Sequence, residues 1–419
     1  MLKNPYSLLG IVVDEGIALK PFSFVHVADL HLGYAQYNLE ARREDFDRAF
    51  QELVNKALEL KPDFVIIAGD VFQQARPLNS TLENVIQNLR KLRDANIPVL
   101  AVDGSHDAAP NVVTGTILNP LDSAGLIYYL PRHEGACWKD DNCYVYGIPN
   151  FRTKRRTEEM LPAFLEKNPP ILDSSKFNIF VFHMALDMPE FKPPQMEAEA
   201  TPEMIPDGFN YYAGGHVHQP FNMKFKSGIL VYSGCTETVN YEDANVEKGF
   251  FHVRVDEKSV PSLRRVKLES PRPFKIFNQK DYTGMMPAKI TEEVVQLVKD
   301  EDQDGVIIVP VIKGVLPAEA NRNEVDLTKI RSAAEKALLV HPIMRLKTSE
   351  VPEEVIQAIF EGELKDLKTK AFEYFLQIFA ERYPRDEAEK VGRLAIGLLE
   401  PLTRKDEEKA KQVLEEYVN

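Results

Sequence analysis

The chain is poor in cysteine, in long apolar runs and in net positive charge. Its three cysteines, Cys137, Cys143 and Cys235, are odd in number and show no C-x-x-C spacing, which argues against a disulfide framework or a thiolate zinc site and favours a reducing, cytoplasmic setting. No stretch approaches the roughly 18 apolar residues that a membrane-spanning helix needs. The net charge is −13, whereas proteins that coat nucleic acid are usually basic. The overall charge counts against such a coat but leaves a local basic surface open.

The opening residues lack most parts of a leader peptide. A Lys and a short apolar run are cut short by Asp14 and Glu15, and no A-x-A-like cleavage site follows. We therefore expect residues 1–21 to be a small N-terminal extension and not a signal peptide. With 419 residues, 44% of them hydrophobic and 27% charged, the chain has a globular composition and the length of two or three domains.

Strand-like and helix-like patterns alternate over residues 22–265, which predicts a layered α/β domain. A Pro-rich joint, "SPRPF", follows. Residues 270–347 combine helical patterns with the strand "GVIIVPVI" and predict a small second α/β domain. Residues 350–419 carry helical stripes without strand signals and predict a helical tail. The first stripe comprises Leu364, Leu367, Ala371, Phe375 and Ile378, and the second Val391, Leu394, Ala395, Leu398 and Leu399.

Polar residues gather where apolar strands end, in five separate clusters. Taken alone, each is more simply explained as a turn or as a histidine satisfied in the core. Taken together they predict a metal site, because ligands bind at the carboxyl ends of strands in an open α/β sheet and because carboxylates mixed with imidazoles suit divalent Mn, Fe or Zn. The clusters are D-x-H (Asp29, His31), G-D (Gly69, Asp70), G-S-H-D (Gly104–Asp107), His183 alone and G-H-x-H (Gly215–His218). The four histidines outside them, to which we assign structural roles, are His26, His133, His252 and His341.

In this order the clusters resemble the signature of the calcineurin-like metallophosphoesterase superfamily, D-x-H, G-D, G-N-H-(D/E), H and G-H-x-H, over residues 22–255. Other stretches are similar to the SbcD-type (meiotic-recombination-eleven-type) nuclease subunit of the double-strand-break repair complex. They are "HVADLHLGY", "AGDVF" with "ARPLNSTL", "GGHVHQP", "YSGCTE" and "KGFFHV".

The resemblance implies a four-layer α/β/β/α sandwich, with the second α/β domain as a DNA-binding capping domain. It implies a metal-dependent DNA exo/endonuclease that processes DNA ends and forms a homodimer. Such an enzyme works in the cytoplasm at the nucleoid, and we expect no membrane partner. It further implies that the helical tail binds a coiled-coil, SMC-like ATPase subunit.

By the same resemblance, two divalent ions, assigned as Mn²⁺, bind among the clusters. Independently of the resemblance, two cations about 3.5–4 Å apart lower the pKa of a bound water and offset the charge that builds on phosphorus. The residues implied as ligands are Asp29, His31 and His218 for one ion, His183 and His216 for the other, Asp70 as the bridge, and Ser105 at the position of a further ligand.

Two positions depart from the family pattern. Ser105 stands where the family has a metal-binding Asn; because a hydroxyl is shorter than an amide, it reaches an ion only through a water or a shifted backbone, and we expect the second ion to bind more loosely. Gln73 stands where nucleases of this subfamily often have a His that helps to place the phosphate. Glutamine donates a hydrogen bond but cannot carry a proton in the same way. Neither change removes a charged ligand, so we expect activity.

His106 is the expected proton donor to the leaving oxygen, since its family counterpart contacts the phosphate. Asp107 either orients the His106 imidazole and raises its basicity or caps a turn, and both interpretations stay open. The candidate substrate contacts are Gln73, Arg76 and Tyr34, whose ring either stacks on a base or packs in the core.

Two other functions stay open. A phosphodiesterase for small or nucleotide substrates would need the same ions but has no use for the second domain and the tail. A weakly active scaffold that binds DNA ends for the ATPase is suggested by Ser105 and Gln73. Two basic runs, "FRTKRR" and "LRRVKLESPRPFK", suit phosphates, but each alone is more simply a solvated face, so DNA as substrate rests mainly on the resemblance.

Overall fold

A computed structural model divides the chain into two compact units, Met1–Phe274 and Lys275–Asn419, which are described separately. The division comes directly after the Pro-rich joint. The predicted N-terminal extension, apart from residues 19–21, and the first helical stripe of the predicted tail lie outside the described residues. The described residues are 19–108, 115–188, 197–317, 320–348, 372, 376, 384–403, 409 and 411–414.

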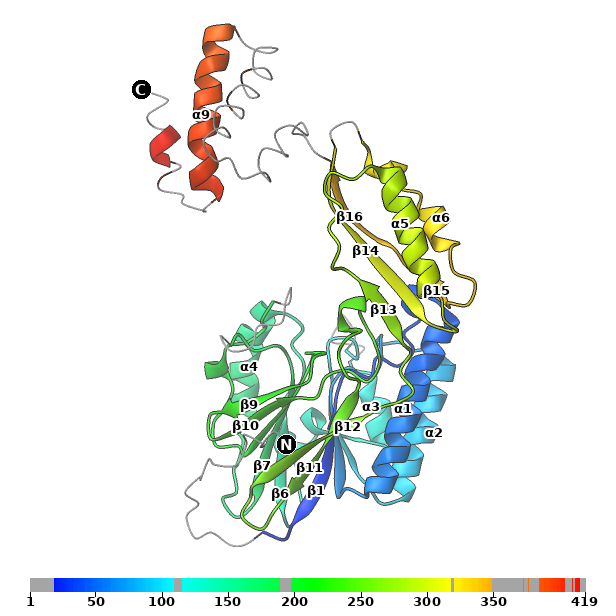
Figure 1. Cartoon of the computed structure of the whole chain (residues 1–419). Coiled ribbons are helices and arrows are strands. Elements are labelled where there is room, and N and C mark those ends of the chain that lie inside the picture. Colours follow the sequence, from blue (N-terminus) through cyan, green and yellow to red (C-terminus); the bar gives the residue numbers. More distant parts are fainter. Residues whose placement is uncertain are drawn as a thin grey trace, which may run out of the picture. The chain divides into compact units, whose positions relative to one another are not determined.

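The first unit contains two six-stranded sheets (Figure 1). In the first sheet, four parallel strands are extended at one edge by two antiparallel ones, in the order β12-β11-β1-β2-β3-β4. Its strands are β1 (Phe22–Val27), β2 (Phe64–Ala68), β3 (Val99–Val102), β4 (Tyr128–Tyr129), β11 (Gly249–Val255) and β12 (Pro261–Lys267).

The second sheet has the order β5-β6-β7-β8-β10-β9, with parallel strands in the centre and an antiparallel strand at each edge. Its strands are β5 (Cys137–Lys139), β6 (Cys143–Gly147), β7 (Phe177–His183), β8 (Tyr211–Gly215), β9 (Phe221–Phe225) and β10 (Gly228–Tyr232).

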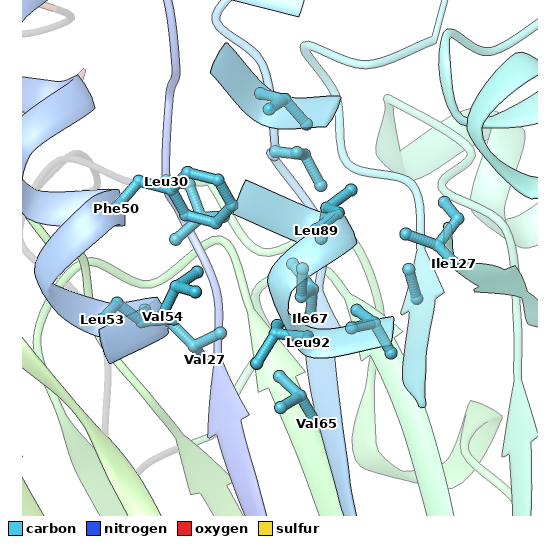
Figure 2. Close-up of a cluster of buried hydrophobic side chains, with 14 of the residues drawn as sticks. Val27, Leu30, Phe50, Leu53, Val54, Val65, Ile67, Leu89, Leu92 and Ile127 are labelled. Carbon is cyan, nitrogen blue, oxygen red and sulfur yellow. The ribbon is translucent and has the colours of Figure 1, made fainter. Parts of the chain in front are cut away.

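Three apolar cores separate the layers of this unit. Helices α1 (Glu40–Leu60) and α2 (Asn79–Asp94) pack on the first sheet; Figure 2 shows Phe50 and Leu53 of α1 and Leu89 of α2 facing the strands. A second core lies between the two sheets, and a third lies between the second sheet and α4 (Lys154–Lys167). The predicted four-layer α/β/β/α sandwich is therefore confirmed.

Strands β1 and β2 are apolar along almost their whole length because each faces two cores. Phe64 and Ile66 of β2 lie in the core between the sheets, whereas Val65 and Ile67 lie in the core under α1 and α2. Successive side chains of a strand point to opposite faces, so a strand buried on both faces reads as a continuous apolar run. Such runs end at the polar clusters.

The second unit contains a four-stranded sheet with α5 and α6 packed on it. Strand β14 is the centre and pairs with β13 and, in parallel, with β15 and β16. The elements are β13 (Phe274–Phe277), α5 (Pro287–Asp300), β14 (Ile307–Leu316), α6 (Leu327–Arg331), β15 (Leu339–Val340) and β16 (Ile343–Thr348).

Further along the chain, α9 (Arg385–Thr403) carries the second predicted stripe, of which Val391, Leu394, Ala395 and Leu398 are half-buried. Among the described helices, none is both long and apolar enough to cross a membrane. The remaining short helices are α3 (Leu118–Ser123) and 3-10 turns at Gln36–Asn38, Leu130–Arg132, Glu134–Ala136, Pro202–Met204, Tyr241–Asp243 and Arg322–Glu324.

Candidate metal centre

The loops that follow β1 and β2 are joined by main-chain hydrogen bonds. The Asp29 amide donates to the Gly69 carbonyl at 3.1 Å, and the His31 amide donates to the Asp70 carbonyl at 3.0 Å. Asp29, His31 and Asp70 have φ values of 56°, 45° and 48°, in the left-handed region that costs a non-glycine residue on the order of 1–3 kcal/mol. These strained turns bring three polar side chains together at the ends of two adjacent strands.

Glycines give the loops room to approach one another. A Cβ on Gly69, whose φ is +88°, would overlap the ring of His183. A Cβ on Gly104 would overlap both the carboxylate and the main-chain nitrogen of Asp70. The G-D and G-S-H-D clusters thus contain glycine because the backbone comes directly against candidate ligands.

The structure brings six of the seven predicted metal ligands together with His106. In each of three groups, one candidate ligand atom per residue lies within 4.8 Å of the others. Two groups correspond to the two predicted ligand sets, with Asp70 in the second, and the third joins Asp70 to the first set and to His106. The groups are Asp29, His31 and His218; Asp70, His183 and His216; and His31, Asp70 and His106.

The ring nitrogens of these histidines fit metal ions. The Nδ1 atom of His31 lies 2.9 Å from Gln73 Oε1, and that of His183 lies 2.8 Å from the Ala68 carbonyl. Because these oxygens only accept hydrogen bonds, each Nδ1 carries a proton and each Nε2 is the ring atom that is available to an ion. The Nε2 atoms of His31 and His183 are buried and form no well-aligned hydrogen bond, and they lie 3.9 and 3.1 Å from Asp70 Oδ2. A cation bound between these nitrogens and the carboxylate would complete the arrangement.

The buried carboxylates of the site also call for positive charge. Asp29 and Asp70 are 0% and 2% exposed, and within the described ranges neither pairs with a Lys or Arg. Burial raises the pKa of Asp29, with His183 acting in the opposite direction. Burial also acts to raise the pKa of Asp70, but the neighbouring His183, together with His31 and His106, outweighs burial and leaves that pKa lowered. Two buried carboxylates that have imidazoles beside them, and no Lys or Arg partner within the described residues, form a charge pattern suited to cations.

His106 lies at the edge of the same cluster. Its amide donates to Asp70 Oδ1 at 2.9 Å, and its ring Nδ1 lies 2.8 Å from the Gln73 carbonyl. The ring packs edge-on against His31, with 5.0 Å between the centroids. The backbone of Gln73 therefore holds the imidazole.

Asp107 is fully buried, and its carboxylate is occupied by main-chain amides. Oδ1 accepts from Phe72 at 2.8 Å, while Oδ2 accepts from Val71 at 3.1 Å and from Gly104 at 3.0 Å. These bonds favour the interpretation of Asp107 as a loop cap, because its carboxylate accepts from the backbone. The His106 ring bonds to the Gln73 carbonyl instead. Asp107 thus joins the loop after β2 to the loop after β3.

The other predicted residues lie near the site in different roles. The Tyr34 ring packs on Phe46, with 5.6 Å between the centroids, so the packing alternative describes it. Arg76 is exposed and makes no ion pair or hydrogen bond within the described part of the chain. Ser105 follows β3, and its carbonyl accepts from Arg152 at 2.8 Å. The structure describes no contact of the Ser105 hydroxyl with the candidate ligands.

Two acidic residues that the sequence patterns do not indicate support the imidazoles. Asp243 Oδ2 lies 2.8 Å from His218 Nδ1, which leaves the His218 Nε2 for an ion. Glu199 is 9% exposed, and its Oε2 lies 3.5 Å from His216 Nε2. Neither follows a strand, and neither forms a spaced motif with its histidine, so the sequence carries no signal for them.

A cavity of about 570 Å³ opens beside His216 and His218. Its wall carries both basic and acidic groups, on segments that follow strands of the second sheet. Its other lining residues are Arg152, Thr153, Lys154, Glu197, Ala198, Glu199, Asn240, Glu242 and Asp243.

The chain is similar in sequence to a known family and to several repair proteins. Residues 22–220 match the family model "Calcineurin-like phosphoesterase". The chain is 32% identical to the DNA double-strand break repair protein Mre11 of Methanocaldococcus jannaschii over 62% of this chain and 69% of that protein. It is 29% identical to Mre11 of Archaeoglobus fulgidus, covering 64% and 68% of the two chains, and 28% identical to Mre11 of Methanococcus maripaludis, covering 70% and 78%. The solved structure of TT1561 from Thermus thermophilus aligns at 12% identity over 59% of this chain and 100% of that one, with a TM-score of 0.37.

The family match covers the strands that carry most of the clustered side chains, and the relatives extend it beyond β10. The chain therefore belongs to the calcineurin-like phosphoesterase family, with the Mre11 proteins as its relatives, and is a metal-binding hydrolase of phosphodiester bonds.

Proposed function

We propose that this protein is a DNA nuclease that processes DNA ends with two divalent ions, Mn²⁺ in preference, during double-strand-break repair. The observation that supports it most directly is the convergence of two buried carboxylates and several imidazoles, whose candidate ligand atoms lie within 4.8 Å of one another in each group. The relatives are named for double-strand-break repair, which supports DNA as the substrate.

The two ligand groups give each ion its own residues. The residues proposed to hold the ions are Asp29, His31 and His218 for one, His183 and His216 for the other, Asp70 between them, and Ser105 through a water. When bound, two such ions activate a water and offset negative charge on the phosphoryl group. The Nδ1 partners of the imidazoles keep each ring in the tautomer that binds metal.

His106 is proposed as the proton donor to the leaving oxygen. Because its Nδ1 donates to the Gln73 carbonyl, the transferable proton of the cationic ring lies on Nε2. Its ring lies against His31 and so beside the first ligand group. Asp107 is proposed to support this transfer through the loop that carries His106, since its carboxylate caps backbone amides.

Basic side chains beside the cavity suit a polyanionic substrate. Lys154 and Arg156 are exposed and form no ion pair within the described residues, and Arg152 lies on the cavity wall. Such groups release counterions when they meet phosphates, so DNA binding should weaken as salt rises. Arg76, exposed on the loop after β2, is proposed as a further contact to the DNA backbone.

The assay compares linear duplex DNA with bis-p-nitrophenyl phosphate in Mn²⁺. We expect cleavage of both by the wild type and of neither by Asp70→Asn, which removes the bridging charge. Cleavage of the small ester alone would point to a small-substrate phosphodiesterase and would overturn the DNA assignment.

A second candidate, a DNA-end scaffold of low activity, is favoured by Ser105 in the place of an amide ligand. The variant Ser105→Asn distinguishes the two. A large gain in cleavage from a nearly silent wild type supports the scaffold, whereas an active wild type that changes little supports the nuclease.

We also propose a homodimer and a coiled-coil, SMC-like ATPase as partners, with the second α/β domain as a DNA-binding cap. The stripe of α9 is half-buried by the chain itself, with Phe372 beside Gly392. We propose that an ATPase coiled coil covers the part of the stripe that stays exposed. Sedimentation equilibrium at micromolar concentration, alone and with the ATPase, tests both partners. A monomer in both experiments would refute them.

A further inference from the structure

Gln73 contacts two histidines of the site through two different groups. Its side-chain Oε1 lies 2.9 Å from His31 Nδ1, and its main-chain carbonyl lies 2.8 Å from His106 Nδ1. Its amide donates to the Leu32 carbonyl at 3.0 Å, which fixes the loop after β2 against the loop after β1. One residue therefore touches a candidate metal ligand and the candidate proton donor.

Both contacts set which ring nitrogen carries a proton. An amide oxygen and a peptide carbonyl accept hydrogen bonds and do not donate them, so Nδ1 is protonated in both rings. For His31 this leaves the buried, unpartnered Nε2 with its lone pair directed at the cluster. For His106 it leaves Nε2 as the atom that exchanges a proton with the substrate.

We propose that Gln73 is a positioning residue, which holds His31 for metal binding through its side chain and His106 for proton transfer through its backbone. This inference rests on the proposed metal site. It differs from a role in substrate binding, because the Gln73 oxygen is occupied by His31 and only its amide NH₂ group is left for another partner.

The two contacts respond differently to substitution. A side-chain change at position 73 removes the bond to His31 but leaves the carbonyl that holds His106. Loss of an outer partner of a metal-bound histidine weakens metal binding by about 10–100-fold. Gln73→Leu should therefore lower the affinity for one of the two Mn²⁺ ions and leave the other unchanged.

The variants form a graded set. Gln73→Leu has no acceptor, Gln73→Met keeps the length of the side chain without an acceptor, and Gln73→Glu restores an oxygen that accepts from Nδ1. Gln74→Leu is the matched control, because Gln74 is the exposed neighbour on the same loop. Thermal melts establish that each variant is folded, and Gln73→Met serves if Gln73→Leu is not.

The measurement is Mn²⁺ binding without substrate, followed by the electron paramagnetic resonance of free Mn²⁺. We expect two ions per wild-type chain, at least tenfold weaker binding of one ion in Gln73→Leu or Gln73→Met, and wild-type binding in Gln73→Glu and Gln74→Leu. In metal-free protein, ¹⁵N spectra should show His31 protonated at Nδ1 in the wild type and a tautomer mixture in Gln73→Leu.

The possible results distinguish a failure of the proposed role of Gln73 from a failure of the proposed metal site. A wild type that binds no Mn²⁺ refutes the proposed metal site itself. A wild type that binds two ions, with Gln73→Leu and Gln73→Met binding them equally well, refutes the role of Gln73 alone. A loss in Gln73→Glu as large as that in Gln73→Leu also refutes it, because the acceptor would then not matter.

Discussion

Replacing Arg42 by Met tests a buried charge network that ties α1 to the segment after β10. The guanidinium is fully buried and donates to the Asp45 carboxylate, to Glu237 Oε1 at 3.1 Å and to the Thr238 carbonyl at 2.9 Å. Its Nε donates to Gln36 Oε1 at 3.0 Å. Four acceptors in three parts of the chain thus depend on one side chain.

The expected loss of stability depends on which hydrogen-bond donors remain to each acceptor after Arg42 is replaced. Asp45 retains Arg272, whose nitrogens lie 2.6 and 2.7 Å from its two oxygens. Glu237, which is 0% exposed, keeps the main-chain amides of Thr238 at 2.6 Å and of Arg272 at 3.0 Å as donors. Breaking a buried ion pair by removing one partner costs about 3–5 kcal/mol. Because Asp45 keeps a partner, we expect Arg42→Met to lower the free energy of unfolding by about 3 kcal/mol.

Urea unfolding measures this change through Trp138, the single tryptophan of the chain, whose ring lies 5.4 Å from that of Phe64. The matched control is Arg43→Met, one residue along α1, since Arg43 pairs with the exposed Glu40 and such surface pairs are worth about 0–1 kcal/mol. Adding Glu237→Gln to Arg42→Met should recover part of the loss, because it removes the unpaired charge. Equal unfolding free energies for Arg42→Met and Arg43→Met would refute the reasoning.

Three further predictions concern the site and the core. Gly104→Ala places a methyl group against the Asp70 carboxylate and should abolish Mn²⁺ binding in a folded protein; retained binding in a titration would show that the loops can separate. Mn²⁺ at 100 times its Kd should stabilise the wild type by about 2.7 kcal/mol per site, and thermal melts should show a far smaller gain for Asp70→Asn. An equal gain in both proteins would show that the ions bind elsewhere. Burial lowers the pKa of His26 to about 3, so the unfolded chain binds the extra proton and stability is lost as pH falls from about 6.5 towards 3. In His26→Phe/Tyr211→Phe, which removes both partners of a buried hydrogen bond, urea unfolding at pH 7 and pH 4 should show a smaller loss, and an unchanged loss would exclude His26 as its source.

The positions of most candidate ligands could be predicted because these residues lie at the ends of buried strands or directly after them. Asp29 and Asp70 come two residues after the ends of β1 and β2, and His183 is the last residue of β7. The carboxyl ends of parallel strands meet at one edge of a sheet, so the linear sequence was enough to place Asp29 and Asp70 of the first sheet near one another. The approach of His183, which ends a strand of the second sheet, depends on how the two sheets stack.

Residues whose role depends on distant loops could not be placed in the same way. The amides that occupy Asp107 include those of Val71 and Phe72, which are 36 and 35 residues away in the chain. The contact of Glu199 with His216 is likewise set by the fold. No local pattern encodes either one.

The second unit shows the same limit for a helix. The apolar spacing predicts a helix over residues 327–338, but α6 ends at Arg331. The carboxylate of Asp302 accepts hydrogen bonds from the amides of Glu335, Lys336 and Ala337 at 2.8 to 3.2 Å. These bonds occupy amides that a continued helix would use, so tertiary structure overrides the local preference.

Because β1 and β2 are buried on both faces, a change in their pairing would affect both the stability and the activity of this enzyme. Since β1 and β2 supply two cores and end at the ligands, a one-residue slip in either strand would exchange the faces of its apolar side chains and turn the ligands away at the same time. The geometry of the candidate site and the stability of the sandwich therefore depend on the same pairing register of β1 and β2. Substitutions that disturb the pairing of these strands should lower the fraction of folded protein. The molecules that do fold should keep full activity.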